Sequence, residues 1–318
     1  MITAFQFLHY LIAGTIVGLN ALGAGIAQGK ISRAAIKAMD IQPAAKDEIS
    51  RCNFLALAII ETASVIGSLF AVLLIFSKPT SIYSVIAEIA IAFSLGFIGF
   101  LVSTCSIRPA KIGLYAIARQ PFLSKKITNL MLLILSLLQS AFVFGFLISI
   151  AVFFQKDNIT NLPHAIKLMS AGLALGLGAI GPVIGISRFA QSALNGLAVN
   201  QHSYPKIITF TFISQAIIET PILFSLIIGV LLALLPGSVT KTNLESVTYI
   251  IIAIAAGIGT LGAGIASGKT AASACNQIAL KPELYPILSR TSMIAQGLID
   301  TCAIYAFAIS LLLLIINI

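Results

Sequence analysis

Charged residues are scarce in this chain of 318 residues. Asp, Glu, Lys and Arg together make up 9% of it, whereas a soluble domain carries about 25%. Tryptophan is absent, and only three histidines and four cysteines occur, with the cysteines at 52, 105, 275 and 302. No two cysteines form a CxxC pair and the histidines are scattered, so neither a metal site nor a disulfide framework is indicated. The shortage of charge excludes an ordinary soluble protein.

Hydrophobic residues fill the space that charge leaves, at 58% of the chain and a mean hydropathy of +1.05. A bilayer core is crossed by about 20 consecutive apolar residues in a helix. Eight stretches reach that length, and they run at 4–27, 52–76, 84–107, 127–154, 164–187, 207–235, 247–268 and 291–317. We therefore expect an all-α integral membrane protein with eight transmembrane helices. The first stretch lacks the basic start and the cleavage site of a signal peptide, so we expect it to remain as a helix.

The net charge of +9 would suit nucleic acid, but its distribution follows a membrane topology. The eight stretches pair into four hairpins, and 15 of the 19 Lys and Arg lie on the side of the loops within hairpins. The side of the connectors between hairpins holds the other four, which are Lys78, Lys156, Lys167 and Lys241. The positive-inside rule then places the hairpin loops in the cytoplasm and both termini outside. No basic patch interleaved with aromatic residues is present, so we expect no nucleic-acid partner.

A hairpin repeated four times organises the chain, with copies at 1–79, 80–157, 158–240 and 241–318. Each copy has one special position in its second helix, and these are Glu61, Gln139, Glu219 and Asp300. The residues 33 positions before them are Gln28, Ser106, Ile186 and Ser267. The loops also correspond, as Gln42-Pro43, Gln120-Pro121, Asn200-Gln201 and Lys281-Pro282. Connectors of about ten residues, at 77–83, 155–163 and 235–245, are expected to be short turns.

Three of the special positions are acids near the middle of the membrane. Glu61 lies ten residues beyond Arg51, which corresponds to about 15 Å along a helix and reaches the centre of a core about 30 Å thick. A carboxylate at that depth is costly and usually marks an ion pathway. Three equivalent acids therefore predict an ion carrier. Gln139 cannot titrate, so the second hairpin is expected to be silent in transport, although its amide could instead help to coordinate a neighbour's ion.

Small residues dominate the first helix of most hairpins, and small faces let membrane helices approach closely. The glycines concerned are Gly14, Gly18, Gly23, Gly25 and Gly29, then Gly172, Gly176, Gly178, Gly181 and Gly185, and finally Gly257, Gly259, Gly262, Gly264 and Gly268. These faces predict a crowded inner circle of helices. Pro182 and Pro221 are expected to distort the third hairpin, because proline removes a helical hydrogen bond. Glu88, a few residues inside the third stretch, is interpreted as an interfacial residue.

These features together resemble the c subunit, or proteolipid, of rotary ATP synthases, with four copies fused in one chain. The segments that carry the resemblance are 24–30 (AGIAQGK), 58–62 (AIIET) and 118–121 (ARQP). They occur in the order of that family: a glycine-rich helix, a polar loop and a second helix with a mid-membrane acid. The resemblance extends over essentially the whole sequence.

The resemblance implies a non-catalytic rotor subunit in a c-ring of several chains, within the F-type enzyme. Glu61, Glu219 and Asp300 would each carry one ion past a stator a subunit as the ring turns. The central stalk would be gripped by the loops, through Gln42, Pro43, Arg119, Gln120 and Pro121. The expected location is an energy-coupling membrane such as the bacterial inner membrane, in contact with lipid. No cofactor is implied.

The transported ion is left open between H⁺ and Na⁺. A hydroxyl follows every special position, as Thr62, Ser140, Thr220 and Thr301, and sodium prefers several oxygen ligands. In sodium-carrying relatives a glutamine on the first helix adds a ligand, and Gln28 matches it. Ser267 could support Asp300 in the same way. A hydroxyl can equally bind a protonated carboxyl, so the pattern serves either ion.

Two other functions compete with this interpretation. A V-type proteolipid also fuses hairpins and can lose one acid, although the acid in the first hairpin and the Arg-Gln-Pro loop favour the F-type. A secondary transporter built from repeats is the second alternative. Transporters often use inverted repeats with broken helices, whereas these four repeats are all parallel.

Overall fold

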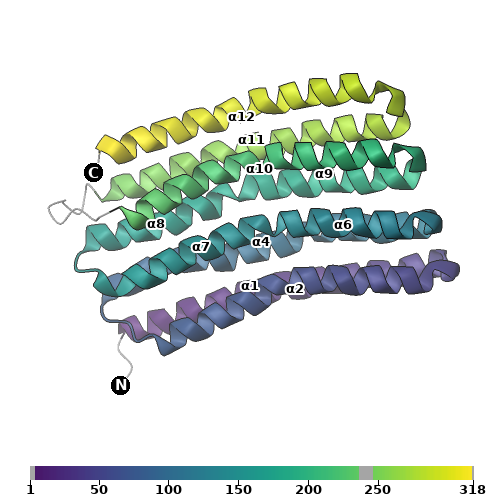
Figure 1. Cartoon of the computed structure of the whole chain (residues 1–318). Coiled ribbons are helices and arrows are strands. Elements are labelled where there is room, and N and C mark those ends of the chain that lie inside the picture. Colours follow the sequence, from purple (N-terminus) through teal and green to yellow (C-terminus); the bar gives the residue numbers. More distant parts are fainter. Residues whose placement is uncertain (1–3, 236–245, 317–318) are drawn as a thin grey trace.

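The computed structural model describes residues 4–235 and 246–316, and these form the expected bundle of long helices (Figure 1). Eight apolar helical segments in the described residues are long enough to cross a membrane. They run Phe5–Ile41, Pro43–Phe76, Ile82–Arg119, Pro121–Asn158, Leu162–Val199, Gln201–Leu234, Val247–Leu280 and Pro282–Ile316. The all-α prediction of four tandem hairpins is confirmed. Lys241 and most of the last predicted connector, 235–245, lie outside the described residues.

Several of these segments contain more than one helix. In the first two hairpins the helices are α1 (Ala4–Ile41), α2 (Lys46–Phe76), α3 (Ile82–Ile91), α4 (Ile98–Cys105), α5 (Ile107–Arg119), α6 (Ser124–Leu138) and α7 (Ser140–Gln155). In the last two they are α8 (Leu162–Gly178), α9 (Ile180–Val199), α10 (Tyr204–Leu234), α11 (Val247–Leu280) and α12 (Tyr285–Ile316). A π-helical turn, η2 (Ala92–Phe97), joins α3 to α4.

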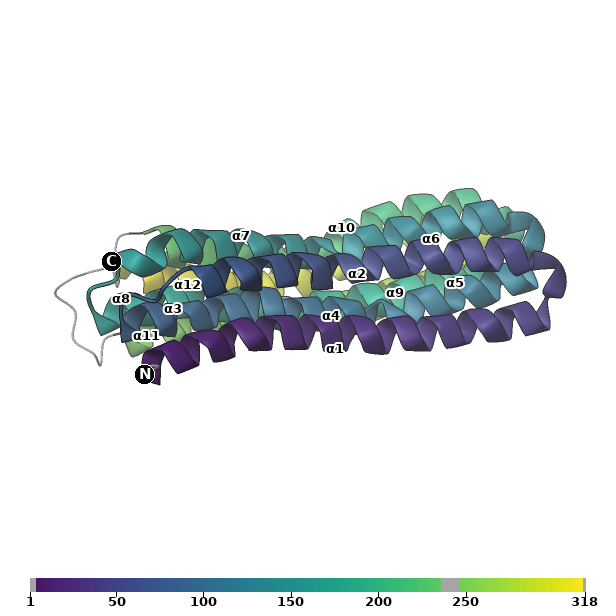
Figure 2. The same ribbon diagram turned by 90° about the horizontal axis from the view of Figure 1, so that it is seen from below.

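The hairpins lie side by side in chain order, with their tight turns at one end and both termini at the other (Figure 1). Seen from below, the helices form two rows (Figure 2). We call α1, α3–α5, α8–α9 and α11 the first row, and α2, α6–α7, α10 and α12 the second row. Each hairpin contributes one long arm to each row.

The helices are longer than the apolar stretches predicted. The first segment has 37 residues, which spans about 55 Å at 1.5 Å per residue, against a hydrocarbon core of about 30 Å. The excess lies at the turn end, because the polar segment after residue 27 stays helical as far as Ile41. That segment has alanines at 34, 35 and 38 and neither glycine nor proline beyond Gly29, so nothing interrupts the helix.

The four tight turns share one geometry. The residue that follows each first helix has a non-helical backbone, with φ of −136° at Gln42, −132° at Gln120, −143° at Asn200 and −130° at Lys281. A short 3-10 turn follows in each case, beginning at Pro43, Pro121, Gln201 and Pro282. Proline disfavours the helical region for the residue before it, which explains three of the four stops. The correspondence of the four loops therefore holds in the backbone.

Two first-row prolines free carbonyls that the next hairpin then satisfies. Pro109 has no backbone N–H to donate to the Cys105 carbonyl. The Ser187 hydroxyl of the third hairpin donates to that carbonyl instead, at 2.6 Å. Pro182 likewise frees the Gly178 carbonyl, which accepts from Thr260 of the fourth hairpin at 3.2 Å. Such rescue by neighbouring Ser and Thr is how membrane helices tolerate proline.

The predicted distortion of the third hairpin is present in its first arm, where α8 ends at Gly178 and α9 begins at Ile180. In its second arm, α10 continues through Pro221 without a break.

Glycine brings the first-row helices close together where the third and fourth hairpins meet. A Cβ added to Gly268 would lie 2.3 Å from the Cα of Gly185, and one added to Gly264 would lie 2.2 Å from the nitrogen of Pro182. The second row packs through larger groups, such as the Phe224 and Phe307 rings at 5.2 Å between centroids. The first row is therefore the narrower side of this seam.

Candidate functional site

The four special positions all lie in second-row arms, part-way along their length. Glu61 is in α2, Glu219 is in α10 and Asp300 is in α12. Gln139 occupies the irregular residue between α6 and α7. The surroundings of the four differ, although their positions in the repeat are equivalent.

Glu219 is bound across a hairpin boundary. Its Oε1 accepts a short hydrogen bond from the hydroxyl of Ser140, which belongs to the second hairpin. The first-row residue equivalent to Gln28 is here Ile186, which is buried and offers no polar atom. The hydroxyl after its own acid, Thr220, donates instead to the Ala216 carbonyl at 3.1 Å. The polar support of Glu219 therefore comes from the neighbouring hairpin.

Asp300 is supported from within its own hairpin. Its side chain is 6% exposed, and the Ser267 hydroxyl on α11 donates to Oδ1 at 3.2 Å. This is the predicted pairing of positions 33 residues apart. Thr301 donates to the Leu298 carbonyl at 2.7 Å, so its hydrogen is not available to the acid. Its oxygen still has lone pairs that a cation can use.

Glu61 is exposed and forms no hydrogen bond or ion pair with any described residue. Gln28, predicted to support it, is half-buried and is not bonded to it either. Thr62 donates to the Ile59 carbonyl at 2.7 Å. The first acid thus stands at the edge of the chain without the partner that its equivalents have.

Gln139 acts as a link between hairpins rather than as a carboxylate. Its Nε2 donates to the Ile59 carbonyl of α2 at 3.2 Å, and its Oε1 is buried with no partner among the described residues. The neighbouring Ser140 supports Glu219. The second hairpin therefore contributes a hydroxyl to the site of the third.

The predicted stalk-facing residues gather at the turn end, far from the acids along the helices. Arg119 and Pro43 are exposed, while Gln42, Gln120 and Pro121 are half-buried. Gln120 Nε2 donates to the Ala198 carbonyl of the third hairpin at 3.4 Å. At the equivalent turn, Asn200 Nδ2 donates to the Ala279 carbonyl of the fourth at 3.0 Å. These turns therefore join successive hairpins in one direction.

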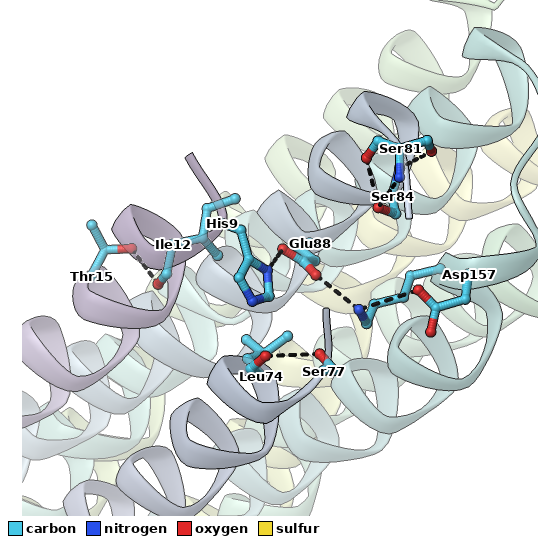
Figure 3. Close-up of polar contacts among 10 residues, drawn as sticks. His9, Ile12, Thr15, Leu74, Ser77, Ser81, Ser84, Glu88 and Asp157 are labelled. Atoms are coloured by element: carbon cyan, nitrogen blue, oxygen red, sulfur yellow. Dashed lines mark hydrogen bonds and ion pairs between the residues drawn. The ribbon is translucent and has the colours of Figure 1, made fainter. Parts of the chain in front are cut away.

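A buried ionic cluster lies near the end of the bundle opposite the tight turns, and no sequence pattern indicated it (Figure 3). Glu88 was expected at the interface, but it is 0% exposed, as are His9 and Lys156. His9 Nδ1 lies 2.7 Å from Glu88 Oε2, and Lys156 Nζ lies 3.0 Å from Glu88 Oε1. The three residues come from α1, α3 and the end of the second hairpin, so the partners are too far apart in sequence for a local pattern to reveal them.

Comparison with known proteins agrees with this architecture. The family model of the ATP synthase c subunit matches residues 11–74, 169–232 and 250–313, which together are more than half of the chain. Each match has its acid, Glu61, Glu219 or Asp300, 50 residues after the first matched residue. The chain belongs to the ATP synthase c-subunit family. The three matches fall on the hairpins that hold an acid, while the hairpin with Gln139 lies between them.

Curated relatives from this family are about the size of one hairpin. The ATP synthase c subunit numbered 2 of Cereibacter sphaeroides is 38% identical over 78 residues, which is 24% of this chain and 94% of the relative. The ATP synthase c subunit of Dehalococcoides mccartyi is 40% identical over 67 residues, covering 21% of this chain and 88% of the relative. The one from Campylobacter jejuni is 33% identical over 77 residues, covering 24% and 69%. This member is therefore an integral membrane protein in which four c-subunit hairpins are fused.

Proposed function

We propose that several copies of this chain close into the membrane rotor of an F-type ATP synthase. Glu61, Glu219 and Asp300 each carry one ion, and ion flow turns the ring. The chain performs no bond chemistry of its own. The proposal rests on a contact between first-row helices that repeats from one hairpin to the next. At both edges of the chain, the glycines equivalent to those in this contact face no described residue.

The pattern is seen in one set of equivalent glycines. In the second, third and fourth hairpins this glycine faces the preceding hairpin closely, because an added Cβ would lie within 3.3 Å of it. The pairs are Gly96 with Ile16, Gly176 with Phe93, and Gly257 with Leu177. A Cβ added to the first-hairpin equivalent, Gly18, would have no described residue within 4 Å, and the same holds for Gly25 and Gly29 on the same helix. This edge of α1 lacks a preceding hairpin.

The opposite edge is open in the complementary direction. Gly23 faces Phe100 of the next hairpin, and Gly181 faces Leu261 of the next. A Cβ added to their equivalent in the fourth hairpin, Gly262, would lie more than 4 Å from every residue that the structure describes. The edge of α11 therefore matches the edge of α1 in a second copy. Glycine packing in the first row and phenylalanine packing in the second row would curve the assembly with the first row inside.

Closure would also complete the site of Glu61. Glu219 takes its hydroxyl partner, Ser140, from the preceding hairpin. In the equivalent position across the chain boundary, Thr301 of one copy would lie beside Glu61 of the next, with its hydroxyl bonded to the Leu298 carbonyl and its oxygen lone pairs available to a cation. Each junction between copies would then form one ion site, with the exposed Glu61 enclosed.

The second hairpin is proposed to be silent in transport. Its amide links to the first hairpin and its hydroxyl serves Glu219. Three ions per four hairpins would lower the ion-to-ATP ratio relative to a ring with an acid in every hairpin. Carbodiimide labelling of the acids with and without Na⁺ distinguishes H⁺ from Na⁺ as the transported ion.

The F-type assignment rests on the acid in the first hairpin and on Arg119-Gln120-Pro121 in a turn. The cytoplasmic orientation of the turns rests on the distribution of Lys and Arg. Purification of the intact complex tests the F-type assignment, because F-type stalk and stator a subunits should accompany the chain. Recovery of V-type subunits instead would favour the V-type proteolipid.

Disulfide cross-linking tests the junction between copies. Cys52 Sγ lies 3.7 Å from Met131 Sδ across the boundary of the first two hairpins, and the equivalent pair across copies is Thr291 with Asn53. In a background without the native cysteines, Thr291→Cys with Asn53→Cys should yield a ladder of cross-linked chains on a denaturing gel. Thr291→Cys with Phe54→Cys is the control, because Phe54 lies about 100° around the helix from Asn53. Equal cross-linking by both pairs, or none by the first, would reject the ring.

A further inference from the structure

A cavity of about 260 Å³ between α1 and α5 is lined by four cations. Its lining consists of Lys30, Arg33, Ala34, Lys37, Lys111 and Tyr115. Every lining residue belongs to a first-row helix, so the cavity opens on the first-row face and not between the rows. It lies on the turn side of the ion-site level, since Lys30 follows Gln28 by two residues.

The positive charge of this cavity is not balanced by acids. Among the described residues, none of its four cations forms an ion pair within 4.0 Å. The helix α5 contains no acid, and the acid of α1 is Asp40, near the turn. Four cations that converge without counter-ions favour a bound anion.

The size and chemistry of the cavity suit a phosphate group. Arginine and lysine bind phosphate oxygens through charge-assisted hydrogen bonds, and the Tyr115 hydroxyl can add a donor. Drug-sized ligands occupy about 300–1,000 Å³, so this cavity fits a headgroup-sized anion. Basic pockets between transmembrane helices on the cytoplasmic side are a known setting for anionic lipid headgroups.

This concentration of cations is found at the first seam, which is the boundary between the first and second hairpins. Lys30 has basic equivalents in every hairpin, which are Arg108, Arg188 and Lys269. Arg33 and Lys111 correspond to Gln191 and Ala272 in the last two hairpins, and Lys37 corresponds to Asn195 and Asn276. The second seam has a smaller set, where Arg108 and Arg188 line a cavity of about 240 Å³. The repeat has thus diverged toward one strongly basic cavity per chain.

We propose that the cavity formed by Lys30, Arg33, Lys37 and Lys111 binds one phosphate-bearing anion per chain. The anion is either the headgroup of an anionic phospholipid on the first-row face or phosphate from solution. The site does not take part in ion transport, and the proposal stands whether or not the ring closes.

Native mass spectrometry of the full-length protein, titrated with phosphatidylglycerol or phosphatidylcholine, tests the lipid source. Titration calorimetry with inorganic phosphate in phosphatidylcholine bicelles tests the soluble source. Each surface Lys or Arg contributes about a fivefold gain in anion affinity, so Arg33→Gln with Lys111→Gln should weaken binding roughly 30-fold. Lys46→Gln with Lys125→Gln, two exposed lysines in the first turns of α2 and α6, removes the same charge and should leave binding unchanged.

The lipid titration and the phosphate titration distinguish the two sources of the anion. One phosphatidylglycerol per chain, lost in the cavity variant, assigns the site to lipid, while phosphate binding without lipid preference assigns it to a soluble anion. Arg33→Lys with Lys111→Arg keeps the charge and should retain binding, which separates loss of the site from misfolding. Equal weakening by the Lys46→Gln, Lys125→Gln control, or no weakening by the cavity variant, would overturn the proposal.

Discussion

The buried cluster of His9, Glu88 and Lys156 allows a stability prediction that depends on charge pairing alone. All three side chains are 0% exposed, with contacts of 2.7 and 3.0 Å to the Glu88 carboxylate. Glu88→Gln removes the buried negative charge and leaves the Lys156 ammonium beside a neutral amide, with the half-exposed Asp157 carboxylate at 3.4 Å as its remaining ion-pair partner. Breaking a buried pair in this way costs about 3–5 kcal/mol, and we expect a loss of that size in the free energy of unfolding.

Removal of both charges should behave differently. Glu88→Leu with Lys156→Met replaces the pair by apolar groups of similar volume, and such replacements are often neutral or stabilising by about 1–4 kcal/mol. The double variant should therefore be more stable than Glu88→Gln, although it carries more changes.

The assay is reversible unfolding of the purified chain in mixed micelles by titration with dodecyl sulfate, followed by circular dichroism. Glu283→Gln is the matched control, because Glu283 is exposed in the last turn and its change should cost no more than about 0.5 kcal/mol. If Glu88→Gln cost no more than the control, or if the double variant were as unstable as the single one, the pairing argument would be wrong.

Three further predictions concern the repeat. Gln139→Glu adds a fourth acid per chain, so four ions instead of three would pass for each chain that turns past the stator. Since each ion yields about 2.3 kcal/mol per 100 mV, vesicles with this variant should begin to make ATP at about three quarters of the driving force that the native protein needs. An unchanged threshold driving force would contradict this. Thr260→Val leaves the carbonyl freed by Pro182 unpaired and should lower the free energy of unfolding by about 0.6–1.7 kcal/mol, whereas Thr270→Val, which removes a hydroxyl bonded to its own helix, serves as control. Gly25→Val should leave the single chain folded but abolish large assemblies on size-exclusion chromatography, and intact assemblies would argue against the open edge of α1.

Much of the fold could be predicted from the sequence, because hydropathy and a repeat are properties of the chain itself. The eight apolar stretches gave the eight spanning segments, and the spacing of the acids gave the register. The ends of the helices could not be read from hydropathy. Polar residues such as those between Lys30 and Ile41 remain helical beyond the membrane, so the loops are shorter than the gaps between apolar stretches.

The details of the candidate site depend on contacts between hairpins, which local spacing does not encode. The sequence suggested Thr220 as support for Glu219, but that hydroxyl bonds to its own helix and Ser140 takes its place. The equivalent positions Ser267 and Asp300 do form a hydrogen bond, and both lie in one hairpin. Glu88 was misplaced at the interface, since its partners belong to α1 and to a connector.

The central claim is that three carboxyls per chain bind the transported ion while the second hairpin binds none. Carbodiimide labelling of the assembled protein, with mass spectrometry of each hairpin, with and without Na⁺ over a range of pH, measures this directly. The account predicts labelling at Glu61, Glu219 and Asp300 and none in the hairpin with Gln139. Protection by Na⁺ would identify a sodium rotor, and labelling that follows pH but ignores Na⁺ would identify a proton rotor. No labelling at any of the three acids would contradict the account.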